Sequence, residues 1–315
     1  MSDKPNLSAL FGSDEITTFL GMESCEDLEQ LSADVAILGV PCATPYKSVG
    51  AYCAGGPQAI RAGVAAFAAN LKHHDFDLGG PLVPAGKSVV DCGDLPFDEA
   101  DSEGNRQNIK ETVGKILEAG AVPIVLGGDD SIPIPMLQAF EGRGKYTILQ
   151  IDAHVDWRDE VQGERLGLSS TMRRASEMSH IESIIQVGQR GIGSARSSDV
   201  QDALDWGVNF VSARDVDWGG AEAALSLIEP GAKVIVCFDV DALDPAIMPG
   251  AIGRAPGGLS YWDMVDLLEG VADKAQIAAM DIVEFMPERD VDQIGALTAG
   301  RIVATAAGLI CRQHK

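Results

Sequence analysis

The stretch Tyr146–His154 reads YTILQIDAH, a run that is mostly apolar and then ends in acidic and imidazole side chains. It lacks the alternation of apolar and polar residues that marks a strand with one face in water. Continuous apolarity indicates a strand buried on both faces, which is typical of a parallel sheet sandwiched between helices. Seven further runs of this kind are Val35–Pro41, Ser88–Asp94, Val122–Asp129, Ile184–Gly191, Val208–Ala213, Val234–Asp241 and Ile277–Phe285.

Most of these runs are separated by helical patterns, which lie at Gly56–Asn70, Gln107–Ala119, Tyr261–Asp273 and Gln293–Cys311. Ser260 is expected to be the N-cap residue of the helix at Tyr261–Asp273. Alternation of strands and helices along the whole chain predicts a single three-layer α/β/α sandwich around a mostly parallel sheet of about eight strands. Residues 1–30 are polar and irregular, so we expect an arm or cap there and the main domain over residues 31–315.

The composition argues against several classes of binding partner. The 315-residue chain has 24 basic and 47 acidic side chains, a formal charge of −23. Such a charge repels phosphate backbones and anionic lipid, so neither nucleic acid nor a membrane is expected as a partner. We see no apolar stretch near the ~18 residues of a membrane span and no signal-peptide core. Scattered cysteines without a CxxC pair indicate reduced thiols, and the protein is expected to be soluble and cytoplasmic.

Three acidic motifs fall at the carboxyl ends of predicted strands, where open parallel sheets place their ligand sites. They are GGDDS (Gly127–Ser131), DAHVD (Asp152–Asp156) and DVDALDP (Asp239–Pro245). A single acidic residue at a strand end is as typical of a cap for the next helix or turn as of a metal ligand. Three such motifs together favour a cation site, because buried carboxylates repel each other unless a cation neutralises them.

The spacing within the motifs predicts which side chains converge. If the chain stays extended beyond the strands, Asp152, His154 and Asp156 project to one side, and Asp239 and Asp241 behave alike. Carboxylates with one imidazole are suitable ligands for a hard or borderline divalent cation. We therefore expect these five residues to hold one or two divalent ions.

A fourth strand end carries Glu284, within DIVEF and ahead of Pro287. A carboxylate that lies beside a metal site and is not needed as a ligand suits a cationic group such as a guanidinium, bound through two oxygens. Taken alone, a glutamate such as Glu284 is more often a helix-cap or salt-bridge residue than a substrate contact.

These motifs resemble those of the ureohydrolase (arginase/agmatinase) family, whose patterns are GGDHS, DAHxD, SxDVDxxDP and ExxP. GVP near Val40, GGPQAIRAG at Gly55–Gly63, RRA at Arg173–Ala175 and GQRG at Gly188–Gly191 also match, in the expected order. The resemblance extends from about Val35 to Ile310, and such an ordered set of motifs is highly specific.

The resemblance implies an arginase-like fold, with residues 31–315 as a ureohydrolase-like catalytic domain that hydrolyses a guanidino compound to urea and an amine. Asp152 and Asp239 would bridge two metal ions. Asp156 would complete the ligands of the first ion, and His154 and Asp241 those of the second ion. Manganese is expected, as two ions or one, with Ni²⁺ as the alternative. Trimers or hexamers are implied, of this chain alone or with a paralogous subunit.

The catalytic residues implied by the same resemblance are Asp152, His154 and Glu284, with Glu284 holding the guanidinium. Substrate contacts are further expected from Trp157 and Arg158, directly after DAHVD, although packing would explain both equally well.

Two histidines of the family pattern are missing. The GGDHS histidine, a ligand of the first ion, is Asp130 here. Aspartate still coordinates a divalent ion and biases the site towards Mn²⁺; otherwise Asp130 is no ligand and the site binds one ion. The family's proton-transfer histidine, which precedes RRA, is replaced near Leu168, and losing a general acid lowers the rate by ~10²–10⁴ unless another group substitutes.

The segment Cys42–Gly56 also departs from the family pattern, since it lacks the arginine of agmatinase-like members and offers Tyr46, Lys47 and Tyr52. We therefore expect an active amidinohydrolase whose substrate is not arginine, such as a guanidino acid, an alkylguanidine or a biguanide. The alternative is a non-catalytic or weakly active subunit of a hetero-oligomeric ureohydrolase. A deacetylase-like hydrolase of the same fold is disfavoured, because the motif set is that of ureohydrolases.

Overall fold

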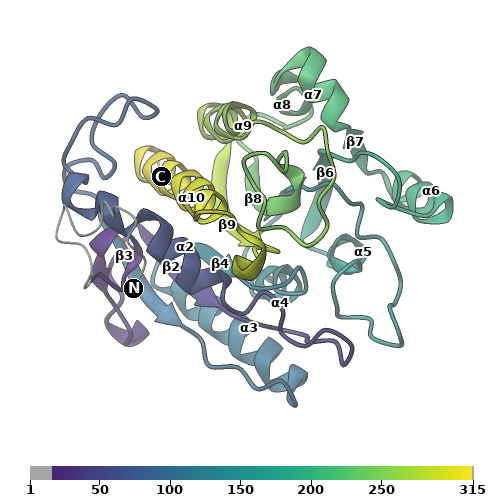
Figure 1. Ribbon diagram of the computed structural model, residues 1–315, viewed down its shortest axis with the longest axis horizontal. Coiled ribbons are helices and arrows are strands. Elements are labelled where there is room, and N and C mark those ends of the chain that lie inside the picture. The colour runs from purple at the N-terminus through teal and green to yellow at the C-terminus, as the bar shows by residue number, and fades with distance from the viewer. Residues whose placement is uncertain (1–15, 314–315) are drawn as a thin grey trace.

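One sheet organises the computed structural model, which describes residues 16–313 (Figure 1). Within these residues nine strands pair in the order β1-β3-β2-β4-β9-β8-β5-β6-β7, and every neighbouring pair is parallel. They are β1 (Glu23–Ser24), β2 (Val35–Val40), β3 (Val89–Asp94), β4 (Val122–Gly127), β5 (Tyr146–Ile151), β6 (Ile181–Val187), β7 (Asn209–Val211), β8 (Lys233–Asp239) and β9 (Gln276–Val283). Eight of the nine coincide with the predicted apolar runs, and β1 is the additional edge strand.

The four predicted helices are present as α2, α3, α9 and α10, and the first of them is divided into α2 and a 3-10 segment, η3. The helices α4 to α8 were not predicted individually. Ser260 caps α9 as expected, with its side chain accepting from the backbone N–H of Asp263. The α-helices are α2 (Gly56–Val64), α3 (Ser102–Glu118), α4 (Pro133–Gln138), α5 (Thr171–Ser176), α6 (Ser197–Trp206), α7 (Ala213–Gly219), α8 (Glu222–Leu225), α9 (Tyr261–Lys274) and α10 (Ile294–Arg312). The 3-10 segments are η1 (Phe19–Gly21), η2 (Leu28–Gln30), η3 (Ala65–Asn70), η4 (Val240–Ala242) and η5 (Pro287–Arg289).

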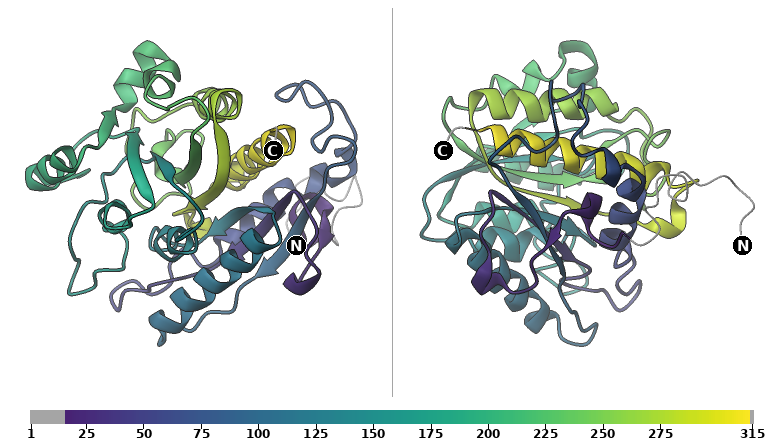
Figure 2. Two further views of the ribbon diagram at one scale, coloured as in Figure 1. Left: turned by 180° about the vertical axis from the view of Figure 1, so that it is seen from behind. Right: turned by 90° about the vertical axis from the view of Figure 1, so that its left-hand side faces the viewer.

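Helices cover both faces of the sheet, so successive side chains of a strand enter different cores. In β2, Ile37 packs in the core formed with α2, α9 and α10, whereas Leu38 packs with α3, α4 and α5 on the opposite face. Figures 1 and 2 show the neighbouring helices α9 and α10 on one side of the sheet and α3 and α4 on the other. The predicted three-layer α/β/α sandwich is confirmed.

The described part of the expected N-terminal arm, residues 16–30, packs against the edge of the sheet. Phe19 in η1 is fully buried, and its backbone N–H donates to Asp91 at 2.6 Å. β1 pairs with β3 beside it. Residues 1–15, the other half of the expected arm, lie outside the described residues, as do His314 and Lys315.

By length and composition alone, the C-terminal helix α10 is apolar enough to cross a membrane. This differs from the expectation that no apolar stretch approaches the length of a membrane span. Inside the fold, however, 78% of its apolar window is buried. It packs against α2 and α9, so its apolarity is that of a core helix.

The strand order brings four strand ends together. β4 and β5 follow each other in the sequence but are separated in the sheet by β9 and β8. Because all four strands are parallel, their carboxyl ends meet at one edge, at the kind of switch point where open α/β sheets bind ligands. The residues that follow these strands include Asp130, Asp152, Asp241 and Glu284.

Candidate metal centre

Two sets of possible metal ligands lie at this edge of the sheet. One consists of Asp130, Asp152 and Asp156, and the other of Asp152, His154 and Asp241. Within each set, one ligand atom per residue lies within 4.8 Å of the others. Asp152 belongs to both sets.

His154 supplies the imidazole of the second set. Its Nδ1 lies 3.0 Å from Asp241 Oδ2 and 3.4 Å from Asp152 Oδ1. Hydrogen bonds to Asp152 and Asp241 raise the pKa of His154 to about 11, against the opposing effect of burial. The imidazole therefore lies where a cation is favoured, and a divalent ion bound there would displace its proton.

The buried carboxylates fit a divalent cation. Asp130, Asp152 and Asp239 are at most 6% exposed. Burial raises the pKa of each carboxyl well above its usual value, and the charges of neighbouring carboxylates raise it further. Asp130 Oδ2 is buried and has no hydrogen-bond partner among the described residues. Anions this close together need protons or a cation to stabilise them, and the unpaired oxygen of Asp130 is available to such a cation.

The loop that follows η4 covers the second set closely. A side chain at Gly253 would place its Cβ 2.6 Å from Asp241 Oδ2 and 3.0 Å from His154 Cε1. Only glycine therefore leaves space between this loop and the ligands.

The expected extended geometry of the motifs is wrong, although their side chains do converge. β5 ends at Ile151, and Asp156 has a positive φ of 47°, so residues 152–156 turn instead of alternating. After Asp239 the chain enters the 3-10 segment η4, because the Asp239 side chain accepts from the Asp241 N–H at 2.8 Å. Local capping hydrogen bonds of this kind outweigh continuation of a strand beyond the edge of the sheet.

Asp239 is adjacent to the ligand sets but belongs to neither of them. Its Oδ1 accepts from the Asp241 N–H, and the charges of Asp241 and Asp152 contribute to its raised pKa. Asp239 is thus joined by a local hydrogen bond to Asp241, a member of the second set.

Glu284 lies beside the carboxylates with one oxygen already committed. Its Oε1 accepts from the Tyr52 hydroxyl at 2.6 Å and from the Asp130 N–H at 2.8 Å. Within residues 16–313, no hydrogen bond to Oε2 is present. Burial raises the pKa of Glu284 to about 8, opposed by the hydrogen bond from Tyr52. The side chain thus offers a cationic ligand one oxygen instead of the two expected.

Two buried glutamines were missed in the sequence: Gln150 contacts two of the ligands directly, and Gln186 contacts Gln150. Gln150 Nε2 donates to Asp152 Oδ2 at 2.7 Å and to Asp156 Oδ2 at 2.8 Å, and Gln186 donates to Gln150 Oε1. The available signal was a polar residue inside each of two otherwise apolar strands. Gln150 also lies two residues before Asp152, on the same side of β5.

The other predicted substrate contacts do not join the carboxylates. Trp157 is 2% exposed within a hydrophobic core, with its ring 6.1 Å from that of Trp206, which fits the packing alternative. Arg158 is half-buried, and its backbone N–H donates to Ser169. The carbonyl of Leu168, near the position of the missing histidine, accepts from the Tyr46 hydroxyl at 3.2 Å.

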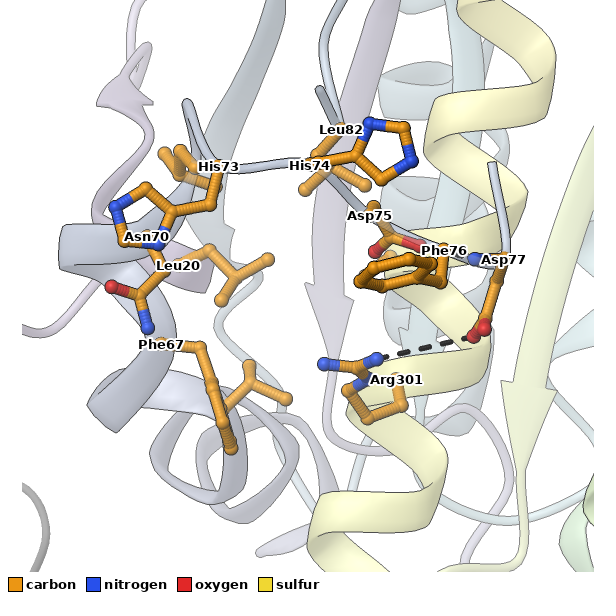
Figure 3. A pocket seen from close by; sticks show the side chains of 13 residues that line it. Leu20, Phe67, Asn70, His73, His74, Asp75, Phe76, Asp77, Leu82 and Arg301 are labelled. Atoms are coloured by element: carbon orange, nitrogen blue, oxygen red, sulfur yellow. Dashed lines mark hydrogen bonds and ion pairs between the residues drawn. The ribbon is translucent and has the colours of Figure 1, made fainter. Parts of the chain in front are cut away.

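Among the described residues, His154 is the only histidine in either ligand set. His180 is buried and its Nε2 lies 2.9 Å from the Leu137 carbonyl. His73 and His74 line a separate pocket of about 280 Å³, where Figure 3 shows them near Phe67 and Arg301. None of these three residues therefore replaces the missing proton-transfer histidine.

Comparison with known proteins agrees with this site. A model of the arginase family matches residues 33–308, and the chain belongs to that family. An agmatinase from Pyrococcus horikoshii is 28% identical over 285 residues, which cover 89% of this chain and 93% of the relative. An N(1)-aminopropylagmatine ureohydrolase from Thermus thermophilus is 33% identical over 216 residues, covering 68% and 71%.

Solved structures extend the similarity to the fold. A proclavaminate amidino hydrolase from Streptomyces clavuligerus matches with a TM-score of 0.80 at 25% identity, covering 96% of this chain and 99% of that chain. The family and the arginase-like fold expected from the motifs are thus confirmed.

Proposed function

We propose that this chain is a metal-dependent amidinohydrolase that releases urea and an amine from a small cationic guanidino compound other than arginine. The observation that carries the proposal is Asp152, shared between two sets of ligands within one buried site. Relatives named as an agmatinase, an aminopropylagmatine ureohydrolase and an amidino hydrolase support the reaction class. Two Mn²⁺ ions are the proposed cofactor, with Ni²⁺ or a single ion as alternatives.

The protein's own groups have separate roles in this proposal. Asp130, Asp152, His154, Asp156, Asp239 and Asp241 would hold the ions, which would supply Lewis acidity and activated water when bound. Glu284 binds the guanidinium through Oε2, the oxygen without a hydrogen bond, while its Oε1 is fixed by other donors. Fixing the carboxylate in this way orients the substrate carbon relative to the ions.

The experiment that tests the proposal combines metal analysis with urea release. Protein loaded with Mn²⁺ or Ni²⁺ is incubated with guanidino acids, alkylguanidines and biguanides, with arginine included. We expect at least one equivalent of metal and urea from one class other than arginine. Metal well below one equivalent together with no urea from any compound would contradict the proposal.

A second candidate function is a non-catalytic or weakly active subunit of a hetero-oligomeric ureohydrolase. It is favoured by one observation, that no described histidine besides His154 lies among the carboxylates to transfer a proton. Metal binding without urea release, together with co-purification of a paralogue that carries GGDHS, would support it. In either case we propose a trimer or hexamer. We also propose a cytoplasmic location, which is supported by the six free cysteines, because the cytosol keeps thiols reduced.

Replacing Asp130 with histidine tests whether Asp130 is a ligand. Asp130→His introduces a nitrogen donor, so bound Ni²⁺ should rise relative to Mn²⁺ by roughly tenfold, the scale on which a ligand's surroundings alter metal affinity. The ratio is measured after dialysis against equimolar ions. Asp129→His is the matched control, because Asp129 is equally buried but belongs to neither ligand set. An unchanged ratio in Asp130→His would exclude Asp130 as a ligand.

Tyr52→Phe tests how Glu284 is held. The variant loses a hydrogen bond to a charged group, worth about 1.5–3 kcal/mol, so we expect KM for the guanidino substrate to rise about 10-fold or more, with kcat changing less. Tyr46→Phe is the control, because its hydroxyl donates to the neutral Leu168 carbonyl. A KM for Tyr52→Phe equal to that of the wild type would show that Tyr52 does not position Glu284.

A further inference from the structure

A row of buried polar residues lies one layer below the proposed metal ligands. The row consists of four residues that are register partners on adjacent strands: Gln186 of β6, Gln150 of β5, Cys237 of β8 and Asp281 of β9. All four are at most 2% exposed. Burying amide groups is unfavourable unless they are hydrogen-bonded, so the contacts of the two glutamines need an explanation beyond the fold.

The Gln150 amide group has both of its N–H bonds directed to proposed ligands of one ion. Nε2 lies 2.7 Å from Asp152 Oδ2 and 2.8 Å from Asp156 Oδ2. Carboxylates that ligate a metal ion are ionised and only accept hydrogen bonds, so in the proposed metal-bound site the nitrogen and not the oxygen of the amide must face them. This orientation leaves Gln150 Oε1 on the opposite side, where it accepts from Gln186.

Gln186 fixes this orientation of the Gln150 amide by donating to its oxygen. Its Nε2 also donates to the Val155 carbonyl at 2.8 Å, an acceptor that admits only a donor. The chain of hydrogen bonds therefore runs in one direction, from Gln186 through Gln150 to the two carboxylates. Hydrogen bonds in such a buried chain strengthen one another.

The two ligand sets differ in charge, and Gln150 contacts the more acidic one. Asp130, Asp152 and Asp156 would provide three carboxylates to one divalent ion, whereas the set that contains His154 would provide two carboxylates and an imidazole. Two N–H donors stabilise the negative charge of Asp152 and Asp156 and hold these carboxylates in fixed orientations. In the His154 set, Asp152 is instead approached through Oδ1, which lies 3.4 Å from the His154 ring.

We propose that Gln150, supported by Gln186, is the positioning residue that allows the all-carboxylate set of Asp130, Asp152 and Asp156 to bind its ion. The inference rests on the proposed metal centre but not on hydrolysis. It assigns to Gln150 an effect on one of the two ions and little effect on the other. A residue that only stabilised the fold would weaken both ions alike.

The test is Gln150→Met, which keeps the length of the side chain and removes its donors. Isothermal titration with Mn²⁺ should show one of two binding events weakened 10- to 100-fold, the usual effect of losing a group that supports metal ligands. Electron paramagnetic resonance should show the signal of coupled Mn²⁺ ions replaced by that of a single ion. Gln189→Met is the control, because Gln189 donates only to backbone carbonyls beside the site, among them that of Asp152.

Gln186→Met serves as the second variant if Gln150→Met does not fold. It removes the donor to Gln150 Oε1 and should weaken the same ion by a smaller factor. Two Mn²⁺ ions bound with wild-type affinity in the folded variants, or equal weakening of both ions, would overturn the inference. A wild-type protein that binds no metal would instead refute the proposed function, so the two failures are distinguishable.

Discussion

Asp152→Asn is expected to abolish binding of both divalent ions and to reduce urea release by more than about 100-fold. Among residues 16–313, Asp152 alone is common to the two ligand sets. Loss of a group that only supports a metal ligand already costs 10- to 100-fold in metal affinity or activity. At a Mn²⁺ concentration 100 times the dissociation constant, binding stabilises the wild type by about 2.7 kcal/mol. That corresponds to a rise of about 4 °C in melting temperature for a chain of 315 residues. The variant should show no such rise.

The same substitution should act in the opposite direction on the metal-free protein. Burial and the charges of Asp156 and Asp241 raise the pKa of Asp152 well above its usual value, so the ionised carboxylate is unfavourable in the metal-free fold. A neutral amide removes that repulsion, and the melting temperature without metal should equal or exceed that of the wild type. Asp129→Asn is the matched control and should retain the rise with Mn²⁺. A rise in Asp152→Asn equal to that of the wild type would contradict the shared-ligand assignment.

Arg61→Met is expected to lower the free energy of unfolding by about 3–5 kcal/mol, the range found when one partner of a buried ion pair is removed. Arg61 donates to both oxygens of Asp91, at 2.7 and 2.8 Å, and Arg61 is 6% and Asp91 1% exposed. Asp91 also accepts from the Phe19 N–H, so the N-terminal segment depends on the same carboxylate. Urea denaturation of the metal-free protein measures the change.

Two further variants separate the ion pair from general effects of losing arginine. Arg173→Met removes a surface pair with Asp202, whose side chain is 55% exposed, and should change the stability by less than about 1 kcal/mol. Adding Asp91→Asn to Arg61→Met removes the uncompensated charge and should recover part of the loss. A loss in Arg61→Met no larger than in Arg173→Met would show that the buried pair is not important for stability.

Continuous apolarity allowed eight of the nine strands to be predicted from the sequence. Parallel strands covered on both faces need no polar alternation, so runs such as Val35–Val40 were clear. β1 could not be predicted, because Glu23 and Ser24 are exposed and are held there by backbone pairing with β3. The division between α2 and η3 was also hidden, since the Ala-rich segment is compatible with one continuous helix.

The ligand motifs were predictable, whereas the contacts that support them were not. Strand ends and acidic spacing were enough to bring Asp130, Asp152 and Asp241 to one edge of the sheet. The hydrogen bond from Tyr52 to Glu284 joins residues 232 positions apart, and only the folded chain places them together. The turn at Asp156 was missed because its positive φ has no local sequence signal.

The central claim is that one buried carboxylate joins two unequal metal sites. It is tested most directly by anomalous diffraction at the manganese edge from crystals grown with Mn²⁺. We predict two peaks that share Asp152, one among Asp130, Asp152 and Asp156 and the other among Asp152, His154 and Asp241. The absence of any peak next to the Asp152 carboxylate would contradict the account.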